Sequence, residues 1–268
     1  MAGYPDGRCA EWLVGEAIVR HDAELLPWLE GPPQTNEAGR SWGYVAAMLW
    51  LAGQGLPPRW DCIEIGSSAG VNLMIDRYRY DLGGVEVGPA ESGMRIAPEW
   101  RGPPPPPVPA GWGFDAIRGC DVAPVDLTDP AQLLRLRAFV WREHTERFAR
   151  LDFAAHSAGE KKPDLVQADA AEFVEAALAR PQAAGTTRVL MHSIVWQYLG
   201  DARRARITAA MEEAGARASA ERPLAWIMLE ANRETLQHEL VVRYWPGGAE
   251  PHLLGKAHPH GAWAEWVA

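Results

Sequence analysis

The stretch "IEIGSSAGVNLMIDRYRY" (residues 63–80) decides how the rest of the chain is interpreted. A short apolar strand enters a turn with two glycines and two serines, and an amphipathic run follows. The turn "GSSAG" (66–70) fits the pattern G-x-S-x-G, in which Ser68 would be a nucleophile on a sharp turn. The longer pattern E-x-G-x-x-x-G, from Glu64 to Gly70, also fits an acidic, glycine-rich loop that holds a nucleotide-like ligand on a Rossmann-type sheet.

The segments around this turn predict an α/β fold. Strands alternate with helices, and five strand-like segments can be read in order: "WDCIEIG", "FDAIRGCDVAPVDL", "PDLVQADA", "TRVLMHSIVWQYL" and "PLAWIMLEAN". Such alternation predicts a doubly wound, Rossmann-type, mostly parallel sheet with helices on both faces. The segments "HELVVRYWPGG" and "HLLGKAHPHG" predict an antiparallel pair of strands at the C-terminal end. The run "VNLMIDRY" is expected to be helical, and "DPAQLLRLRAFVWREHTERFARLDFAAH" is expected to form a long helix or a pair of helices with Asp129 as its N-cap.

The predicted organisation has two parts. Residues 1–56 are expected to form an N-terminal helical cap, which includes a helix over Ala10–Leu29. Residues 57–268 are expected to form the Rossmann-like domain. An irregular insertion at about 81–113 contains a predicted hairpin with Gly83-Gly84 at its turn and five consecutive prolines, Pro103–Pro107.

Composition excludes several classes of function. The chain has 268 residues, of which 47% are hydrophobic and 23% are charged, as is usual for a globular protein. The net charge of −9 argues against nucleic acid or an anionic membrane as a partner. No apolar run is long enough to span a membrane and no signal peptide is apparent, so we expect a cytoplasmic protein. Three scattered cysteines give no zinc spacing, no metal is expected, and nothing indicates an oligomeric state.

The strand ends favour a ligand-binding loop over a serine nucleophile. A nucleophile elbow should follow a late, central strand and an upstream oxyanion element, and neither is present. A ligand crevice instead requires polar residues after several strands, because the carboxyl ends of parallel strands lie at one edge of the sheet. Asp121, Asp169, His192 and Ser193 come at such ends.

These ordered motifs resemble those of class I S-adenosylmethionine-dependent methyltransferases. The resemblance rests on E-x-G-x-x-x-G followed by "GCDVAPVDL", "QADAAEF" and "VLMHSIVWQYL". It implies a methyltransferase-like sheet, with Asp121 at the ribose hydroxyls and Asp169 near the adenine amine. The implied cofactor-binding residues are Glu64, Gly66, Ser67, Ser68, Gly70, Asn72, Asp121, Asp169 and Ser193. About fifty residues separate Gly70 from Asp121, which is more than a compact Rossmann unit needs.

A second resemblance covers most of the chain. The segments "PPQTNEAGR", "EIGSSAGVNLMIDRYRYD", "GCDVAPVDLTDP", "HSIVWQYL", "PLAWIMLE" and "HPHGAW" are similar to the uncharacterised bacterial family DUF2332. This resemblance implies a methyltransferase-like Rossmann fold without an established substrate. It also implies a longer N-terminal helical region than this chain has.

Each candidate residue also has a structural interpretation. Asp121 can cap its own turn, and Asp169 can be the N-cap of the helix "AAEFVEAAL". Ser67, Ser68 and Asn72 can saturate loop and helix-start amides. His192 is the candidate catalytic base, and its alternative is a histidine bonded to the neighbouring loop.

Two further groups are candidates for substrate or lid contacts. Gln197 and Tyr198 follow the fourth strand and could line a substrate site. Asn36 and Arg40 belong to "PQTNEAGR", which we expect to fold over the crevice, with Arg40 pairing with a carboxylate. The sequence thus predicts an S-adenosylmethionine-dependent methyltransferase acting on a small polar molecule. The alternatives are a serine esterase that uses Ser68 and a non-catalytic binding protein on a methyltransferase fold.

Overall fold

The computed structural model describes residues 10–26, 34 and 36–268, and the chain divides into two compact units, 1–35 and 36–268. The first unit contains α1 (Ala10–Arg20) and α2 (Asp22–Leu25). The helix predicted over Ala10–Leu29 is therefore interrupted at His21, whose backbone is not helical, and residues 27–29 lie outside the described part.

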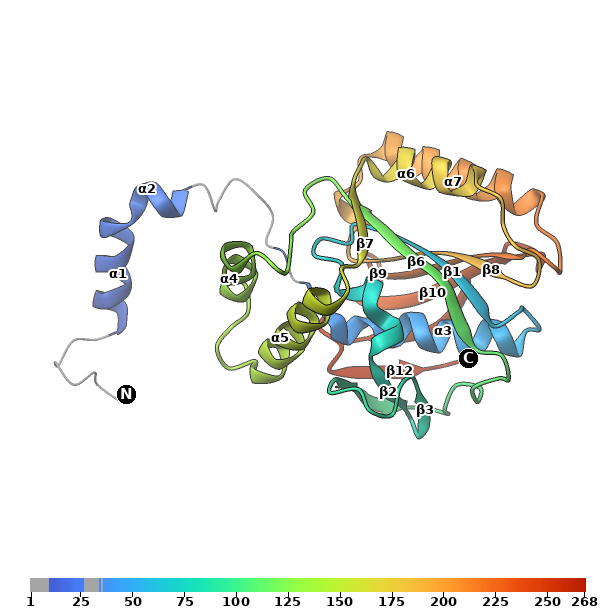
Figure 1. The fold of residues 1–268 in the computed structure, drawn as a ribbon, viewed down its shortest axis with the longest axis horizontal. Coiled ribbons are helices and arrows are strands. Elements are labelled where there is room, and N and C mark those ends of the chain that lie inside the picture. Colours follow the sequence, from blue (N-terminus) through green and yellow to red (C-terminus); the bar gives the residue numbers. More distant parts are fainter. Residues whose placement is uncertain (1–9, 27–33, 35) are drawn as a thin grey trace. The chain divides into compact units, whose positions relative to one another are not determined.

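A nine-stranded sheet forms the centre of the second unit, in the order β5-β12-β11-β10-β9-β8-β1-β6-β7 (Figure 1). Five neighbouring strands run parallel to one another. These are the five predicted strands: β1 (Arg59–Ile65), β6 (Gly113–Asp121), β7 (Asp164–Gln167), β8 (Thr187–Ser193) and β9 (Leu224–Asn232). The prediction of a large, mostly parallel sheet in an α/β fold is confirmed.

Antiparallel strands complete this sheet. β10 (Gln237–Trp245) pairs with β9, and β11 (His252–Ala257) pairs with β10. The predicted antiparallel C-terminal strands are therefore present. Two strands extend the sheet further, since β12 (Trp263–Trp266) pairs with β11 and β5 (Glu99–Arg101) runs parallel to β12 at the edge.

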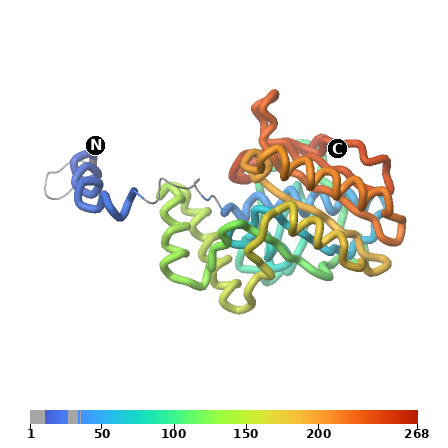
Figure 2. The backbone as a smooth tube through the Cα atoms, turned by 90° about the horizontal axis from the view of Figure 1, so that it is seen from above, coloured from blue at the N-terminus to red at the C-terminus, as the bar shows by residue number. Residues whose placement is uncertain are grey.

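The parallel strands are buried because helices cover both faces of the sheet. Figure 1 shows α6 (Ala170–Ala179) and α7 (Asp201–Ala216) over one face and α3 (Ser41–Gly53) against the other. Figure 2, turned by 90°, shows α6 and α7 again lying together along the sheet. In β8 every residue from Thr187 to His192 is buried, as expected for a strand at the centre of such a sandwich.

The second unit begins at Asn36, earlier than the predicted boundary at residue 56. The physical reason is α3, which is apolar on all sides and packs into the core of the sheet. A side chain added at Gly43 would touch Leu229 of β9 and Leu240 of β10.

Several predicted helices differ in detail. The run after Gly70 forms the 3-10 helix η3 (Val71–Arg77) instead of an α-helix, and Met74 inside it has non-helical torsion angles. The long helical region after it is a pair, α4 (Pro130–Ala138) and α5 (Thr145–Glu160). Asp129 caps α4 by accepting from the backbone N–H groups of Ala131 and Gln132, as predicted.

The insertion contains short strands. β2 (Arg79–Leu82) and β3 (Val85–Val87) form the predicted hairpin, and β4 (Arg95–Ile96) joins β2 in a separate three-stranded sheet. β5 then leaves the insertion and enters the main sheet. Among the residues that the structure describes, no helix has the length and apolar character needed to cross a membrane.

Candidate functional site

The candidate site lies at the carboxyl ends of the parallel strands, where the strand order reverses. β1 has β6 on one side and β8 on the other, so the connections leave β1 and β8 in opposite directions along the sheet. Ligands of open α/β sheets bind at such a point. We call the turns that follow β1, β6, β7 and β8 the rim.

The turn after β1 is held by side chains from two other parts of the chain. The backbone N–H of Ser68 donates to Asp121 Oδ2 at 2.8 Å, and that of Ala69 donates to Asn36 Oδ1 at 2.9 Å. The Asn36 amide also donates to Ser68 Oγ at 3.0 Å. The rim therefore brings together Ser68, Asp121 and Asn36, which the sequence assigned to one site.

Glu64 is the penultimate residue of β1 and is 2% exposed. Its Oε1 accepts from Asn72 Nδ2 at 2.9 Å and from the Tyr44 hydroxyl at 3.4 Å, whereas its Oε2 and Asn72 Oδ1 are buried without a hydrogen-bond partner. Burial raises the pKa of Glu64 to about 7, against the lowering effect of these hydrogen bonds. Two buried acceptors without a donor make this the position best suited to a ligand that donates hydrogen bonds.

The segment around Arg40 contacts the turn after β1 through Asn36 and the end of β8 through Arg40. η2 (Ala38–Arg40) leads into α3, and Arg40 Nη1 donates to Ser193 Oγ at 3.4 Å while its Nε donates to Pro259 O at 2.9 Å. Burial lowers the pKa of Arg40, although Glu37 counteracts this effect. Ser193, at the end of β8, therefore contacts the covering segment directly.

A buried ion-pair cluster fixes the start of this segment. Glu37 is 2% exposed and accepts from Arg147 Nε at 2.6 Å and from Arg150 Nε at 2.8 Å, both on α5. Its Oε1 also accepts from the backbone N–H of Gly39 at 2.9 Å. This cluster holds the cover of the rim to a distant helix.

His192 is enclosed by structural contacts. It is 0% exposed and stacks on Trp196, with ring centroids 5.2 Å apart. Its Nδ1 lies 2.7 Å from Glu230 Oε1, and its Nε2 lies 2.9 Å from the indole nitrogen of Trp226. Because an indole N–H only donates, Nε2 is the acceptor and Nδ1 carries the proton toward Glu230. Both ring nitrogens are engaged, which favours the alternative of a histidine bonded to its neighbours; the role of a catalytic base stays a prediction.

Asp169 lies on the rim but serves its own helix. The turn after β7 is beside the turn after β6, because Ala168 N–H donates to Asp121 O at 3.0 Å. Asp169 caps α6 through the backbone N–H groups of Ala171 and Glu172, and it also pairs with Arg203. The hydrogen bond from Arg203 lowers the pKa of Asp169.

The glycines of the turn make room for protein atoms. A side chain at Gly66, whose φ is 66°, would collide with Val195 in the turn after β8. One at Gly70, with φ 71°, would press on Pro163. These glycines therefore let neighbouring turns pack closely, and their predicted contact with a ligand stays a prediction.

The remaining predicted residues are placed as follows. Ser67 is buried, and its hydroxyl donates to Glu64 O at 3.3 Å. Gln197 and Tyr198 are in η4 (Trp196–Tyr198) and are exposed, Tyr198 to 59%. Among the described residues, the only hydrogen-bond partner of the Ser68 hydroxyl is Asn36, so no histidine is placed to activate it.

Sequence reasoning missed two residues of the site. Tyr44 lies within an apolar helical run, and no local signal marks it as a partner of Glu64. Glu230 comes near the end of β9, so the strand-end rule that selected Asp121 could also have selected it. Within the described part of the chain, no three His, Cys, Asp or Glu side chains are grouped to hold a metal ion.

Comparison with known proteins gives one finding. The family model described as "Uncharacterized protein conserved in bacteria (DUF2332)" matches residues 5–266. No curated protein and no solved structure matches the chain.

Proposed function

This chain belongs to the DUF2332 family of uncharacterized bacterial proteins, and from the geometry of its rim we propose that it is an S-adenosylmethionine-dependent methyltransferase acting on a small polar molecule. The observation that carries the proposal is Glu64 Oε2. It is a buried carboxylate oxygen without a hydrogen-bond partner, at the point where the strand order reverses. A buried acceptor of this kind needs a donor to offset its desolvation.

The ammonium group of a methionine moiety is such a donor. Glu64 Oε2 and Asn72 Oδ1 would accept from it, and each such charge-assisted bond is stronger than a neutral one. Asp121 is half-buried on the same rim, and its carboxylate has lone pairs beyond those used by Ser68 and Ala123, so it can accept from ribose hydroxyls. Asp169 fits an adenine amine less well, because its oxygens already serve α6 and Arg203.

Access to Glu64 requires movement of the covering segment 36–40. Asn36 has a positive φ of 31°, which is an uncommon conformation for a residue other than glycine. Three hydrogen bonds close the rim: Asn36 bonds to the Ser68 hydroxyl and to the Ala69 backbone N–H, and Arg40 bonds to the Ser193 hydroxyl. Breaking them would release the segment from the two turns, and the ion pairs of Glu37 with α5 would have to shift as the segment moves.

When bound, S-adenosylmethionine supplies a methyl group on a sulfonium, which is already electrophilic. The residues of this chain would therefore act by orienting the acceptor in line with that group and by excluding water. We assign no catalytic base, since both ring nitrogens of His192 already take part in hydrogen bonds. Gln197 and Tyr198, exposed just beyond β8, are the residues we propose to contact the acceptor.

Calorimetry with S-adenosylmethionine and S-adenosylhomocysteine tests this proposal. We expect the parent to bind both and Glu64→Gln to bind at least about tenfold more weakly, because a charged acceptor is replaced by a neutral one. Glu175→Gln is the matched control, since Glu175 is exposed on α6 and pairs only with Arg206 among the described residues. Binding of neither compound by the parent would remove the proposal. Binding without transfer to any acceptor would favour the non-catalytic alternative.

A further inference from the structure

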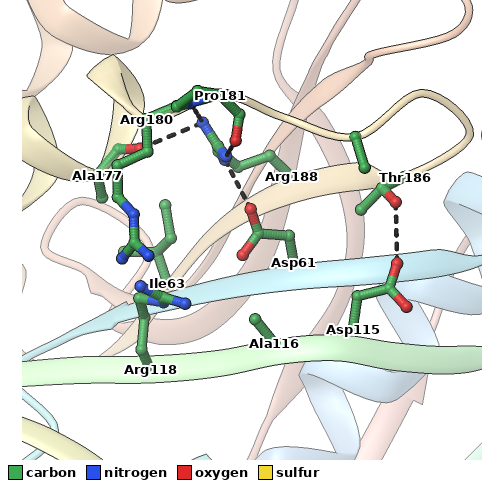
Figure 3. A pocket seen from close by; sticks show the side chains of 11 residues that line it. Asp61, Ile63, Asp115, Ala116, Arg118, Ala177, Arg180, Pro181, Thr186 and Arg188 are labelled. Atoms are coloured by element: carbon green, nitrogen blue, oxygen red, sulfur yellow. Dashed lines mark hydrogen bonds and ion pairs between the residues drawn. The ribbon is translucent and has the colours of Figure 1, made fainter.

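A cavity of about 240 Å³ lies away from the rim, on the face of the sheet that α6 covers (Figure 3). Its floor is formed by β1, β6 and β8, and its wall is formed by the end of α6 and the turn that follows. Two carboxylates and three arginines line it: Asp61, Asp115, Arg118, Arg180 and Arg188.

Each carboxylate already has an arginine of its own. Asp61 accepts from Arg188 Nε at 2.9 Å. Asp115 pairs with Arg59 and accepts from the Thr186 hydroxyl at 2.9 Å. The hydrogen bond from Arg59 lowers the pKa of Asp115, so this carboxylate is ionised at neutral pH and its charge is compensated.

Arg188 is also fully used. Its Nη1 donates to the carbonyl oxygens of Ala177 and Arg180, at 3.2 and 2.9 Å, and its Nη2 donates to Pro181 O at 3.1 Å. These carbonyls lie at and just beyond the C-terminal end of α6, where their partial negative charge would otherwise repel an anion. Arg188 therefore removes the main electrostatic obstacle to a negative ligand in this cavity.

Among the described residues, the guanidinium groups of Arg118 and Arg180 have no carboxylate partner. Figure 3 shows the two guanidinium groups pointing toward one another beside Ile63. Arg118 Nε is buried without a hydrogen-bond partner. Asp164 is opposite Arg118 in the pairing of β6 with β7, yet no ion pair joins the two side chains.

This arrangement is unusual within the molecule. Of the arginines in the described residues, only Arg118, Arg180 and Arg233 make no hydrogen bond or ion pair through their side chains. Arg233 is in the exposed turn between β9 and β10, where water solvates it. The other two share one cavity, in a chain whose net charge is −9.

We propose that Arg118 and Arg180 bind a phosphate group in this cavity, either inorganic phosphate or a small phosphate monoester. Guanidinium groups present several N–H donors in a plane, and two of them from different elements match a doubly charged oxyanion with several acceptor oxygens. The volume accommodates the phosphate and a small organic part. The site is separate from the rim, so this inference does not depend on the proposed methyltransferase activity.

Isothermal calorimetry on the full chain tests the inference, with inorganic phosphate in one arm and glycerol 3-phosphate in the other, at constant ionic strength. We expect the parent to bind at least one of them. Arg118→Gln and Arg180→Gln should each weaken binding about tenfold or more, because each removes charge-assisted hydrogen bonds to the anion. Arg233→Gln is the matched control and should bind like the parent. Tighter binding of the monoester would identify a phosphorylated metabolite as the ligand, and equal binding would identify free phosphate.

Arg180 is exposed, so Arg180→Gln keeps the test valid if Arg118→Gln fails to fold. No binding of either anion by the parent at millimolar concentration would overturn the inference. Unchanged binding by Arg180→Gln would overturn it as well, and so would an equal response to chloride.

Discussion

The backbone N–H of Ser68 donates a hydrogen bond of 2.8 Å to the carboxylate of Asp121, across 53 positions of the chain. This bond joins the turn after β1 to the turn after β6. The two turns meet because β1 and β6 are parallel neighbours whose carboxyl ends lie at the same edge of the sheet. Asp121 also accepts from Ala123 in its own turn, so one carboxylate organises two turns.

Glu64→Gln should change the pH dependence of stability. The pKa of Glu64 is raised to about 7 in the folded chain, from 4.5. Below pH 4.5 the carboxyl is protonated in both states and the substitution should have little effect. As the pH rises to 7 the unfolded chain ionises first, so the parent should lose up to about 3 kcal/mol of unfolding free energy relative to Glu64→Gln. Urea unfolding of both proteins at pH 5 and pH 8 measures this difference, and an equal difference at both values would contradict the assignment.

His192→Ala should unfold more easily by about 2–4 kcal/mol, because it leaves a cavity between Trp196 and Trp226 and removes a partner of Glu230. Trp226→Phe is the milder comparison, because it removes only the indole donor to His192. Loss of this hydrogen bond should lower the unfolding free energy by about 1 kcal/mol, in addition to the effect of the smaller ring on packing. Chemical denaturation measures both. A His192→Ala protein with parental stability and no methyl transfer would restore the role of a base.

Glu37→Gln should destabilise the chain by about 3–5 kcal/mol, because Arg147 and Arg150 would then face a neutral amide in a buried place. Glu175→Gln breaks the exposed pair with Arg206 and should cost less than about 1 kcal/mol. Urea midpoints of the two variants compare the pairs directly. Equal midpoints would show that the cluster on α5 does not hold the covering segment.

Gly66→Ala should destabilise by about 1–3 kcal/mol, because the new methyl group collides with Val195 and the residue keeps a positive φ. The double variant Gly66→Ala with Val195→Ala removes the closest clash, which is with Val195 Cγ2, but leaves the contact with Cβ of residue 195 and the backbone strain. A double-mutant cycle should therefore show a coupling of at least about 0.5 kcal/mol. Additive effects would mean that the two turns do not touch.

Ser68→Ala should cost about 1 kcal/mol of stability through loss of the bond from Asn36, and should leave hydrolysis of p-nitrophenyl acetate at the level of the parent. Among the described residues no histidine contacts Ser68, which is why no esterase activity is expected from it. Hydrolysis by the parent that disappears in Ser68→Ala would support the esterase alternative.

Local signals were sufficient to predict the parallel strands and the turn after β1. A continuous apolar run followed by glycine or aspartate predicts a strand and the turn after it from a few neighbouring residues alone. The position of Asp121 next to that turn also followed, because strand order and parallel direction determine which ends meet. The N-cap at Asp129 was predicted for the same local reason, and the N-cap at Asp169 was recognised as the alternative to ligand binding.

Features that depend on distant contacts were not predictable from local patterns. The ion pair between Glu37 and Arg147 joins residues 110 positions apart, and neither residue type signals its partner. Tyr44 contacts Glu64 from the core face of α3, a face recognisable only after the sheet is placed. β5 pairs with β12, more than 150 positions later in the sequence, and its three residues are too few to show a periodic pattern.

The burial of α3 has a consequence for biosynthesis. This helix is apolar on every side, and the strands that cover it, β9 and β10, come much later in the sequence. While the ribosome makes the intervening residues, the apolar helix lacks its native neighbours, and exposed apolar segments of this kind promote aggregation. We therefore expect a chaperone that binds exposed apolar sequence to protect the nascent polypeptide until β9 and β10 have been made.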